Sequence, residues 1–190
     1  MKNVTFILMT ALVVVVMAAC KDGKPAKEVK PIMVAQENPE TLPEDTTIYG
    51  KCTDATTMNT LYLVDAKGDT LEYVIGDDAN VLGGRYMGDK MAVITEEIYG
   101  EEMATKVINI MSLMGRWKSL DKDFEIKDGG VIESHQEAET KTFTSWKIFN
   151  GKLILAPDTF EINELGPDSM ILENKNGIYG FRRIIVSPKK

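Results

Sequence analysis

The sequence predicts an all-β protein with two small β-barrels or sandwiches. From Thr46 onward, short apolar or alternating runs are separated by turn signals about every 8–12 residues. Asn150-Gly151 stands between two alternating runs and is the strongest hairpin signal in the chain. No long segment keeps a helical period, and only residues 109–113 could form a short helical turn.

The predicted strands fall into two groups with a boundary near Ser112. The first group has five strands, near 46–53, 57–65, 69–75, 90–98 and 103–110. The second has seven or eight, near 115–120, 122–127, 130–135, 141–149, 152–156, 158–164, 169–174 and 178–186. Closing each sheet into a barrel would remove exposed strand edges. We therefore expect one domain over 46–112 and a second over 113–190.

The first 19 residues have the pattern of a secretory signal. Lys2 precedes an apolar run over 6–16, which is too short to span a bilayer, since a spanning helix needs about 20 residues. The run ends in Met17-Ala18-Ala19 before Cys20, which resembles the lipobox of bacterial lipoproteins. The resemblance implies removal of 1–19, acylation of Cys20, and anchoring in the outer membrane on its periplasmic side or at the cell surface. The alternative is an ordinary signal peptide cut after Ala19.

The composition of residues 20–45 predicts the anchor Cys20 followed by a disordered tether. It holds four of the seven prolines and many charges, and it has no aromatic residue. The net charge of −7 becomes −8 once Lys2 is removed. Such an acidic body argues against binding to nucleic acid and against electrostatic adsorption to anionic lipid. The acyl chains on Cys20 are then the expected contact with the membrane.

The second group of strands carries a family resemblance. Gly115-Arg116-Trp117 resembles the G-x-W signature of lipocalins, and the last strand supplies Arg182 and Arg183. Together with the ordered hairpins, these motifs are similar to the lipocalin-like domains of small Gram-negative lipoproteins. The resemblance implies an up-and-down barrel in which one of the two arginines lies across Trp117 and closes the base. The segment is far shorter than a full lipocalin, so we expect short strands and a small cavity.

The first group, 46–112, resembles the small OB-like barrels that accompany such domains in envelope-stress and copper-resistance lipoproteins. Those proteins carry a C-x-x-C motif, and this chain has none. The only cysteine after Cys20 is Cys52, which shares a strand face with Ile48 and is expected to be buried. The resemblance therefore does not carry metal or redox sensing to this chain.

The sequence offers no constellation for catalysis or for a metal. Its one histidine, His135, follows Ser134, and adjacent strand residues point to opposite faces, so a Ser–His pair is not expected. One histidine and one cysteine cannot supply a zinc or copper site. A calcium loop starting at Asp121 would need an acidic twelfth residue, where Ile132 stands. We predict no enzyme activity, no cofactor and no metal.

The function expected is that of a binding module for a small apolar ligand in the cell envelope. The apolar positions of the second barrel would face the ligand, namely Phe124, Ile126, Phe143, Trp146, Ile148, Leu153, Leu155 and Phe160. In so short a barrel the same residues could instead form a solid core. The alternative function is a structural or envelope-sensing lipoprotein that works through contact with another protein.

Overall fold

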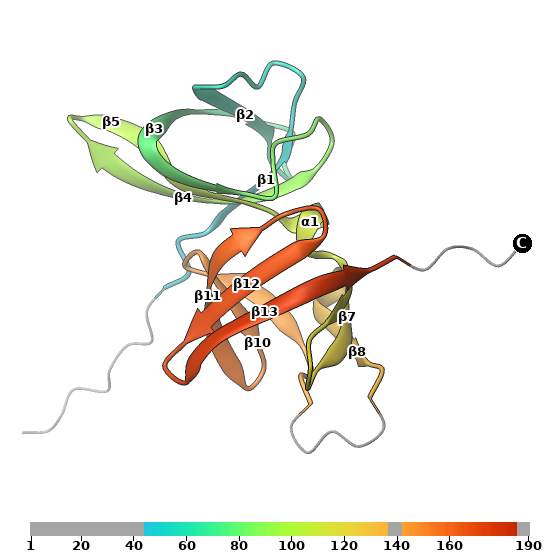
Figure 1. The fold of residues 1–190 in the computed structure, drawn as a ribbon. Coiled ribbons are helices and arrows are strands. Elements are labelled where there is room, and N and C mark those ends of the chain that lie inside the picture. Colours follow the sequence, from blue (N-terminus) through green and yellow to red (C-terminus); the bar gives the residue numbers. More distant parts are fainter. Residues whose placement is uncertain (1–43, 137–141, 186–190) are drawn as a thin grey trace, which may run out of the picture. The chain divides into compact units, whose positions relative to one another are not determined.

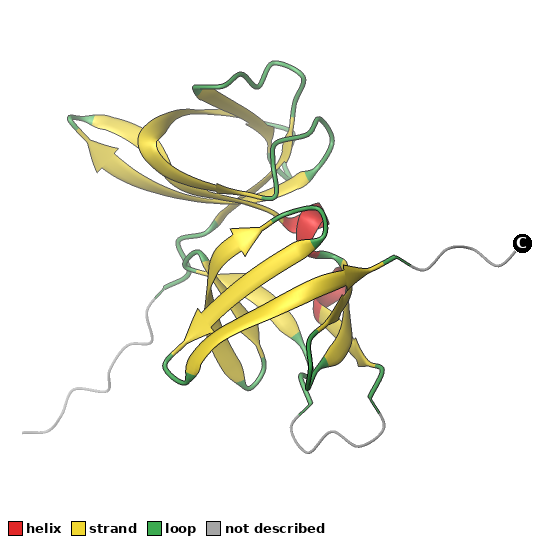
Figure 2. Cartoon of the chain, viewed as in Figure 1, coloured by secondary structure: helices red, strands yellow, loops and turns green. Residues whose placement is uncertain are grey.

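The structure is a computed structural model that describes residues 44–136 and 142–185. The predicted signal, Cys20 and nearly all of the predicted tether lie outside these residues. The described chain is all-β and forms two barrels, as the sequence predicts (Figures 1 and 2). No helix within the described ranges is long and apolar enough to cross a membrane.

The first barrel is closed and has the strand order β1-β2-β3-β5-β4. β3 and β5 run parallel, the other neighbours are antiparallel, and β1 pairs with both β2 and β4. This order is that of an OB-like barrel, so the predicted five-stranded architecture is confirmed. The strands are β1 (Ile48–Cys52), β2 (Thr60–Val64), β3 (Thr70–Leu82), β4 (Lys90–Ile98) and β5 (Glu101–Asn109).

β3 is longer than the sequence predicts, because it continues past residue 75 to Leu82. Its pairing with β5 is regular up to Ile75 and resumes at Asn80, so residues 76–79 form an irregularity within the strand. The polar and glycine residues of this stretch have the composition of a turn. The parallel partner β5 continues alongside them, however, and the chain bends without leaving the sheet.

The second barrel is an up-and-down arrangement of eight strands in the order β8-β7-β6-β13-β12-β11-β10-β9. A single bridge, Val131 to Ser145, joins the two ends of this sheet and nearly closes it. The prediction of seven or eight short strands is confirmed. The strands are β6 (Gly115–Lys118), β7 (Asp123–Lys127), β8 (Val131–Ser134), β9 (Trp146–Phe149), β10 (Lys152–Leu155), β11 (Asp158–Leu165), β12 (Ser169–Asn174) and β13 (Gly177–Ile184).

The predicted helical turn is present as α1 (Ile110–Leu113), between β5 and β6. Its N-cap Asn109 is fully buried and accepts a hydrogen bond from the backbone N–H of Ser112. The Asn109 amide donates to the backbone carbonyls of Gly83 and Gly84 and to the carboxylate of Asp89. The oxygen and the nitrogen of this buried side chain therefore both have hydrogen-bond partners. These bonds hold the loop between β3 and β4 against α1.

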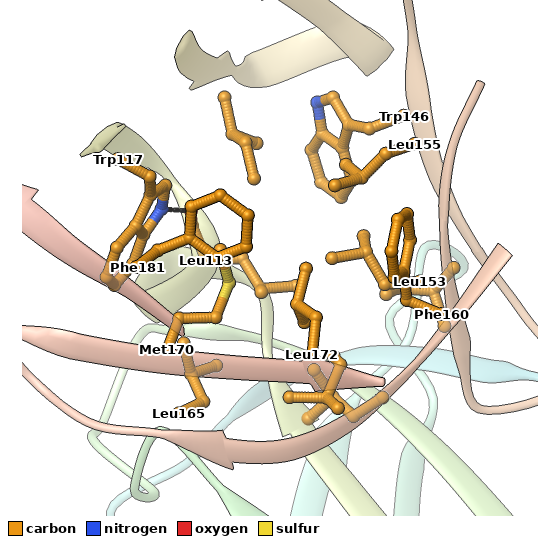
Figure 3. Close-up of a cluster of buried hydrophobic side chains, with 14 of the residues drawn as sticks. Leu113, Trp117, Trp146, Leu153, Leu155, Phe160, Leu165, Met170, Leu172 and Phe181 are labelled. Atoms are coloured by element: carbon orange, nitrogen blue, oxygen red, sulfur yellow. Dashed lines mark hydrogen bonds between the residues drawn. The ribbon is translucent and has the colours of Figure 1, made fainter. Parts of the chain in front are cut away.

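Each barrel has a buried apolar cluster. The first cluster includes Cys52, whose predicted burial is confirmed, together with Leu61, Leu63, Tyr73, Met91, Val93, Ala104 and Val107. The second fills the eight-stranded barrel, and Figure 3 shows part of it. It also takes in Leu82, Ala92, Ile108 and Ile110, which precede the predicted boundary near Ser112. Both barrels belong to one compact unit, residues 42–190. Division into domains 46–112 and 113–190 stays a prediction.

Candidate functional site

Arg183 and Trp117 meet at one end of the eight-stranded barrel. The guanidinium carbon of Arg183 lies 4.2 Å from the ring centroid of Trp117. Trp117 is fully buried, and its indole N–H donates to the carbonyl of Leu113 at 2.8 Å, the dashed line in Figure 3. The two residues pair directly across β13 and β6, so their side chains share a face of the sheet.

The Arg183 guanidinium also satisfies backbone carbonyls around the barrel base. It donates to the carbonyls of Pro167, Met114 and Ser112. Burial lowers the pKa of Arg183 from its ordinary value. Gly115 leaves the space that this arrangement needs, because a Cβ at this position would come within 2.7 Å of the guanidinium, and its φ of +113° also disfavours other residues.

Arg182, the other candidate for the barrel base, has an exposed side chain. Its strand partners are Lys118 on β6 and Ser169 on β12. Because side chains alternate along a strand, only one of two consecutive arginines can face the interior. Arg183 shares its face of β13 with Tyr179 and Phe181, and Phe181 is buried, so Arg183 is the arginine that faces the interior.

The eight predicted ligand-facing residues are all buried. They belong to the cluster that fills the second barrel, and none is more than 9% exposed. Most of the proposed ligand face is therefore a packed core, which is the alternative that the sequence left open. Two of the eight, Phe143 and Phe160, also line a cavity at the opposite end of the barrel from Arg183.

Aromatic side chains gather at that opposite end. Phe124 packs edge-to-face against Phe143 and Phe181, with ring centroids 5.1 and 5.4 Å apart. Phe160 contacts Phe143 and Tyr179 in the same geometry, at 6.0 and 5.8 Å. This arrangement brings the positive ring edges to the negative ring faces and is favoured over direct face-to-face stacking. The five rings form a continuous aromatic layer below the open end.

A cavity of about 300 Å³ lies against this layer, and we call it the mouth cavity. Its apolar lining is Phe143, Phe160, Tyr179 and Phe181. Its polar lining comes from the β6–β7 turn, the start of β11, the end of β12 and the β12–β13 turn, and consists of Asp121, Lys122, Asp158, Asn174 and Asn176. An apolar floor with a few polar groups at the rim is the usual composition of a small-molecule site.

The charged groups of the rim are partly organised by the protein itself. The Lys122 ammonium lies 5.2 Å from the ring centroid of Phe143, within the range of a cation–π contact. Asp121 accepts a hydrogen bond from the hydroxyl of Ser119 at 3.0 Å. The rim therefore presents carboxylates together with one ammonium group that already rests on an aromatic ring.

Sequence reasoning missed Tyr179, Phe181 and the polar rim. The two aromatic residues alternate with Gly180 and Arg182, and this period of two was a readable signal that they share a face with Arg183. The rim could not be found in this way. The rim residues lie on turns and strand ends that are distant in sequence. They come together only when β13 pairs with β6.

Beside the mouth cavity, Asp123 is buried and bound by two cations. Its carboxylate accepts hydrogen bonds from the Arg116 guanidinium at 2.7 and 3.0 Å, and the Lys118 ammonium lies at 3.3 Å. The Arg116 hydrogen bonds are the main cause of a lowered Asp123 pKa. Asp123 belongs to the calcium-like stretch considered above, and its carboxylate is engaged by these cations.

The remaining reactive groups are dispersed. The His135 Nε2 lies 3.3 Å from a carboxylate oxygen of Glu125, and its backbone N–H donates to the carbonyl of Asp123. In residues 44–136 and 142–185, no group of three or more His, Cys, Asp or Glu side chains is placed to hold a metal ion.

The chain was compared with protein-family models, with curated proteins and with solved structures, and none of them matched. The likeness to lipocalin-like and OB-like barrels therefore depends on the motifs and on the strand order described above.

Replacement of Arg183 tests the barrel base. Arg183→Met keeps an apolar contact with Trp117 but loses the cation–π contact and the hydrogen bonds to three carbonyls, two of them part-buried, so we expect the free energy of unfolding to fall by about 2–4 kcal/mol. Arg182→Met is the matched control and should change it by at most about 0.5 kcal/mol. Urea unfolding followed by tryptophan fluorescence measures both. Equal losses for the two variants would contradict the assignment.

Acid titration tests the Asp123 ion pair. The pKa of Asp123 is lowered in the folded protein, so its ionised carboxylate stabilises the fold fully at pH values above the ordinary carboxyl pKa of about 4. This stabilisation disappears as pH falls through the lowered pKa. Asp123→Asn should therefore be less stable than the natural chain at pH 7, by about 2 kcal/mol. The difference should shrink as pH falls below about 4. Urea unfolding at several pH values measures it, and a difference independent of pH would refute the ion pair as its cause.

Proposed function

We propose that this chain is a membrane-anchored, non-enzymatic binding lipoprotein of the cell envelope. In this proposal its eight-stranded barrel receives a small apolar ligand at the mouth cavity. Phe143, Phe160, Tyr179 and Phe181 contact the apolar part of the ligand, while polar groups of the rim orient it.

The observation that carries the proposal is the mouth cavity itself. Its volume of about 300 Å³ lies at the lower end of the range found for small-molecule sites, about 300–1,000 Å³. The interior below it is filled by buried side chains. A compact ligand held at the open end therefore suits this barrel better than a long chain threaded through its centre.

The membrane anchor is supported by the sequence. The short apolar run, the small residues before Cys20 and the proline-rich segment after it are typical of an exported lipoprotein. Acylated Cys20 would hold the protein in the outer membrane, on the periplasmic side or at the cell surface. The acidic charge of the mature chain leaves this attachment to the acyl chains rather than to electrostatics.

A second candidate function, contact with another envelope protein, is favoured by a different observation. Met58, Tyr86 and Met87 are 82%, 66% and 73% exposed on two loops of the first barrel. The Arg85 guanidinium donates to the carbonyls of Thr57 and Met58, which holds the two loops together. Apolar side chains exposed on a fixed surface are typical of an interaction site.

Ligand binding is tested on the mature chain, residues 20–190, with Cys20→Ser so that no detergent is needed. We expect compact ring compounds, with indole as the first probe, to raise the melting temperature, because a ligand that binds only the folded state stabilises it. Tyr179→Ala should abolish the rise. Ile178→Ala is the matched control, since the neighbouring side chain is 67% exposed and outside the cavity.

Differential scanning fluorimetry gives the readout for these variants. If neither indole, other ring compounds nor decanoate shifts the melting temperature, the ligand-binding proposal is wrong. The protein-contact alternative would then be preferred.

The anchor is tested with the two cysteines of the chain. Cells expressing the natural chain are labelled with radioactive palmitate, and the protein is isolated. We expect Cys20→Ala to lose the label and Cys52→Ala to keep it, because Cys52 is buried in the first barrel. Full label retained by Cys20→Ala would show that the palmitate is attached at another position and would contradict Cys20 as the anchor.

A further inference from the structure

The charge of the mouth cavity restricts the kind of ligand that it accepts. Among its lining residues, Asp121 and Asp158 carry negative charge and Lys122 carries positive charge, which leaves one net negative charge. The floor consists of aromatic rings, whose faces are electrostatically negative. A cavity with this lining attracts a cation and repels an anion.

A second observation indicates how a cation would be held. The Lys122 ammonium lies 5.2 Å from the Phe143 ring centroid, so the protein already places an alkylammonium group against the aromatic layer. The other three lining aromatic residues, Phe160, Tyr179 and Phe181, offer further rings within the same cavity. Aromatic walls combined with carboxylates are the recognised means of binding substituted ammonium groups, which lose little hydration on entry.

We infer that the mouth cavity binds a small organic cation, an alkylated or quaternary ammonium group with a compact apolar body. The apolar body lies on Phe143, Phe160 and Tyr179, and the positive charge is stabilised by the rings and by the carboxylate of Asp121. This inference depends on the proposed ligand-binding function, which it narrows to one chemical class. When such a cation binds, the Lys122 ammonium competes with it for the Phe143 ring.

The test uses three probes of nearly equal shape on the mature chain with Cys20→Ser. Choline is the cation, neohexyl alcohol is its neutral isostere with carbon in place of nitrogen, and the tert-butylacetate anion carries the opposite charge. Isothermal titration calorimetry measures each affinity. We expect choline to bind at least about tenfold more tightly than neohexyl alcohol, and the anion to bind least.

Two variants separate the ammonium contact from general charge effects. Lys122→Met keeps the length of the side chain but removes its charge, so choline affinity should rise several-fold. Asp121→Asn keeps the oxygen that accepts the Ser119 hydrogen bond but removes the charge, so choline affinity should fall. Glu96→Gln is the control for Asp121→Asn, because it also removes one negative charge but at an exposed position on the first barrel. It should leave the affinity for choline unchanged. Melting temperatures check that each variant folds.

The possible outcomes separate this inference from the proposed function. Equal binding of choline and neohexyl alcohol would overturn the cation inference and leave the binding function standing. Preference for the anion, or loss of choline affinity in Lys122→Met, would also overturn it, since Lys122 would then anchor a negative group. Failure of all three probes while a ring compound or decanoate binds would overturn the cation inference alone. Failure of these compounds as well would overturn both proposals.

Discussion

The contact of Arg183 with Trp117 is the interaction on which the second barrel depends. A single guanidinium packs on the indole ring and donates to three carbonyls from two separate segments, around α1 and in the turn before β12. It thereby joins the first strand of the barrel, the last strand and the helical turn that leads into them. The link adds to a short ladder of three residue pairs between β6 and β13 and to the packing of Trp117 and Phe181 in the buried cluster.

Closure of the base has consequences for the rest of the barrel. Leu82, Ala92, Ile108 and Ile110, from the strands and helical turn that precede it, complete the same buried cluster. Space for a ligand is then found at the other end, where the β6–β7 turn, the start of β11 and the β12–β13 hairpin meet the aromatic layer. The base is packed with side chains and the cavity lies only at the opposite end, because the strands are too short to enclose a deep interior.

The sequence predicted the strands well because turn residues and alternating apolar residues are local signals. The Asn150-Gly151 hairpin and the helical turn at 110–113 are examples. Features that depend on pairing were less accessible. Residues 76–79 have the composition of a turn but lie within β3, because the neighbouring strand β5 continues beside them. The polar rim of the mouth cavity depends on closure of the whole sheet, so no local pattern reveals it.

The bridge between Val131 and Ser145 gives the second barrel an uneven resistance to expansion. Every other neighbouring pair of strands is joined by a ladder of at least three residue pairs, whereas β8 and β9 are linked by this one bridge in the part of the chain that the structure describes. Widening the barrel there disrupts this bridge and the hydrogen bond from the Trp146 indole to the carbonyl of Lys127, rather than a full ladder. We therefore expect local opening of the barrel to begin between β8 and β9, while the hydrogen bonds of Arg183 hold the base.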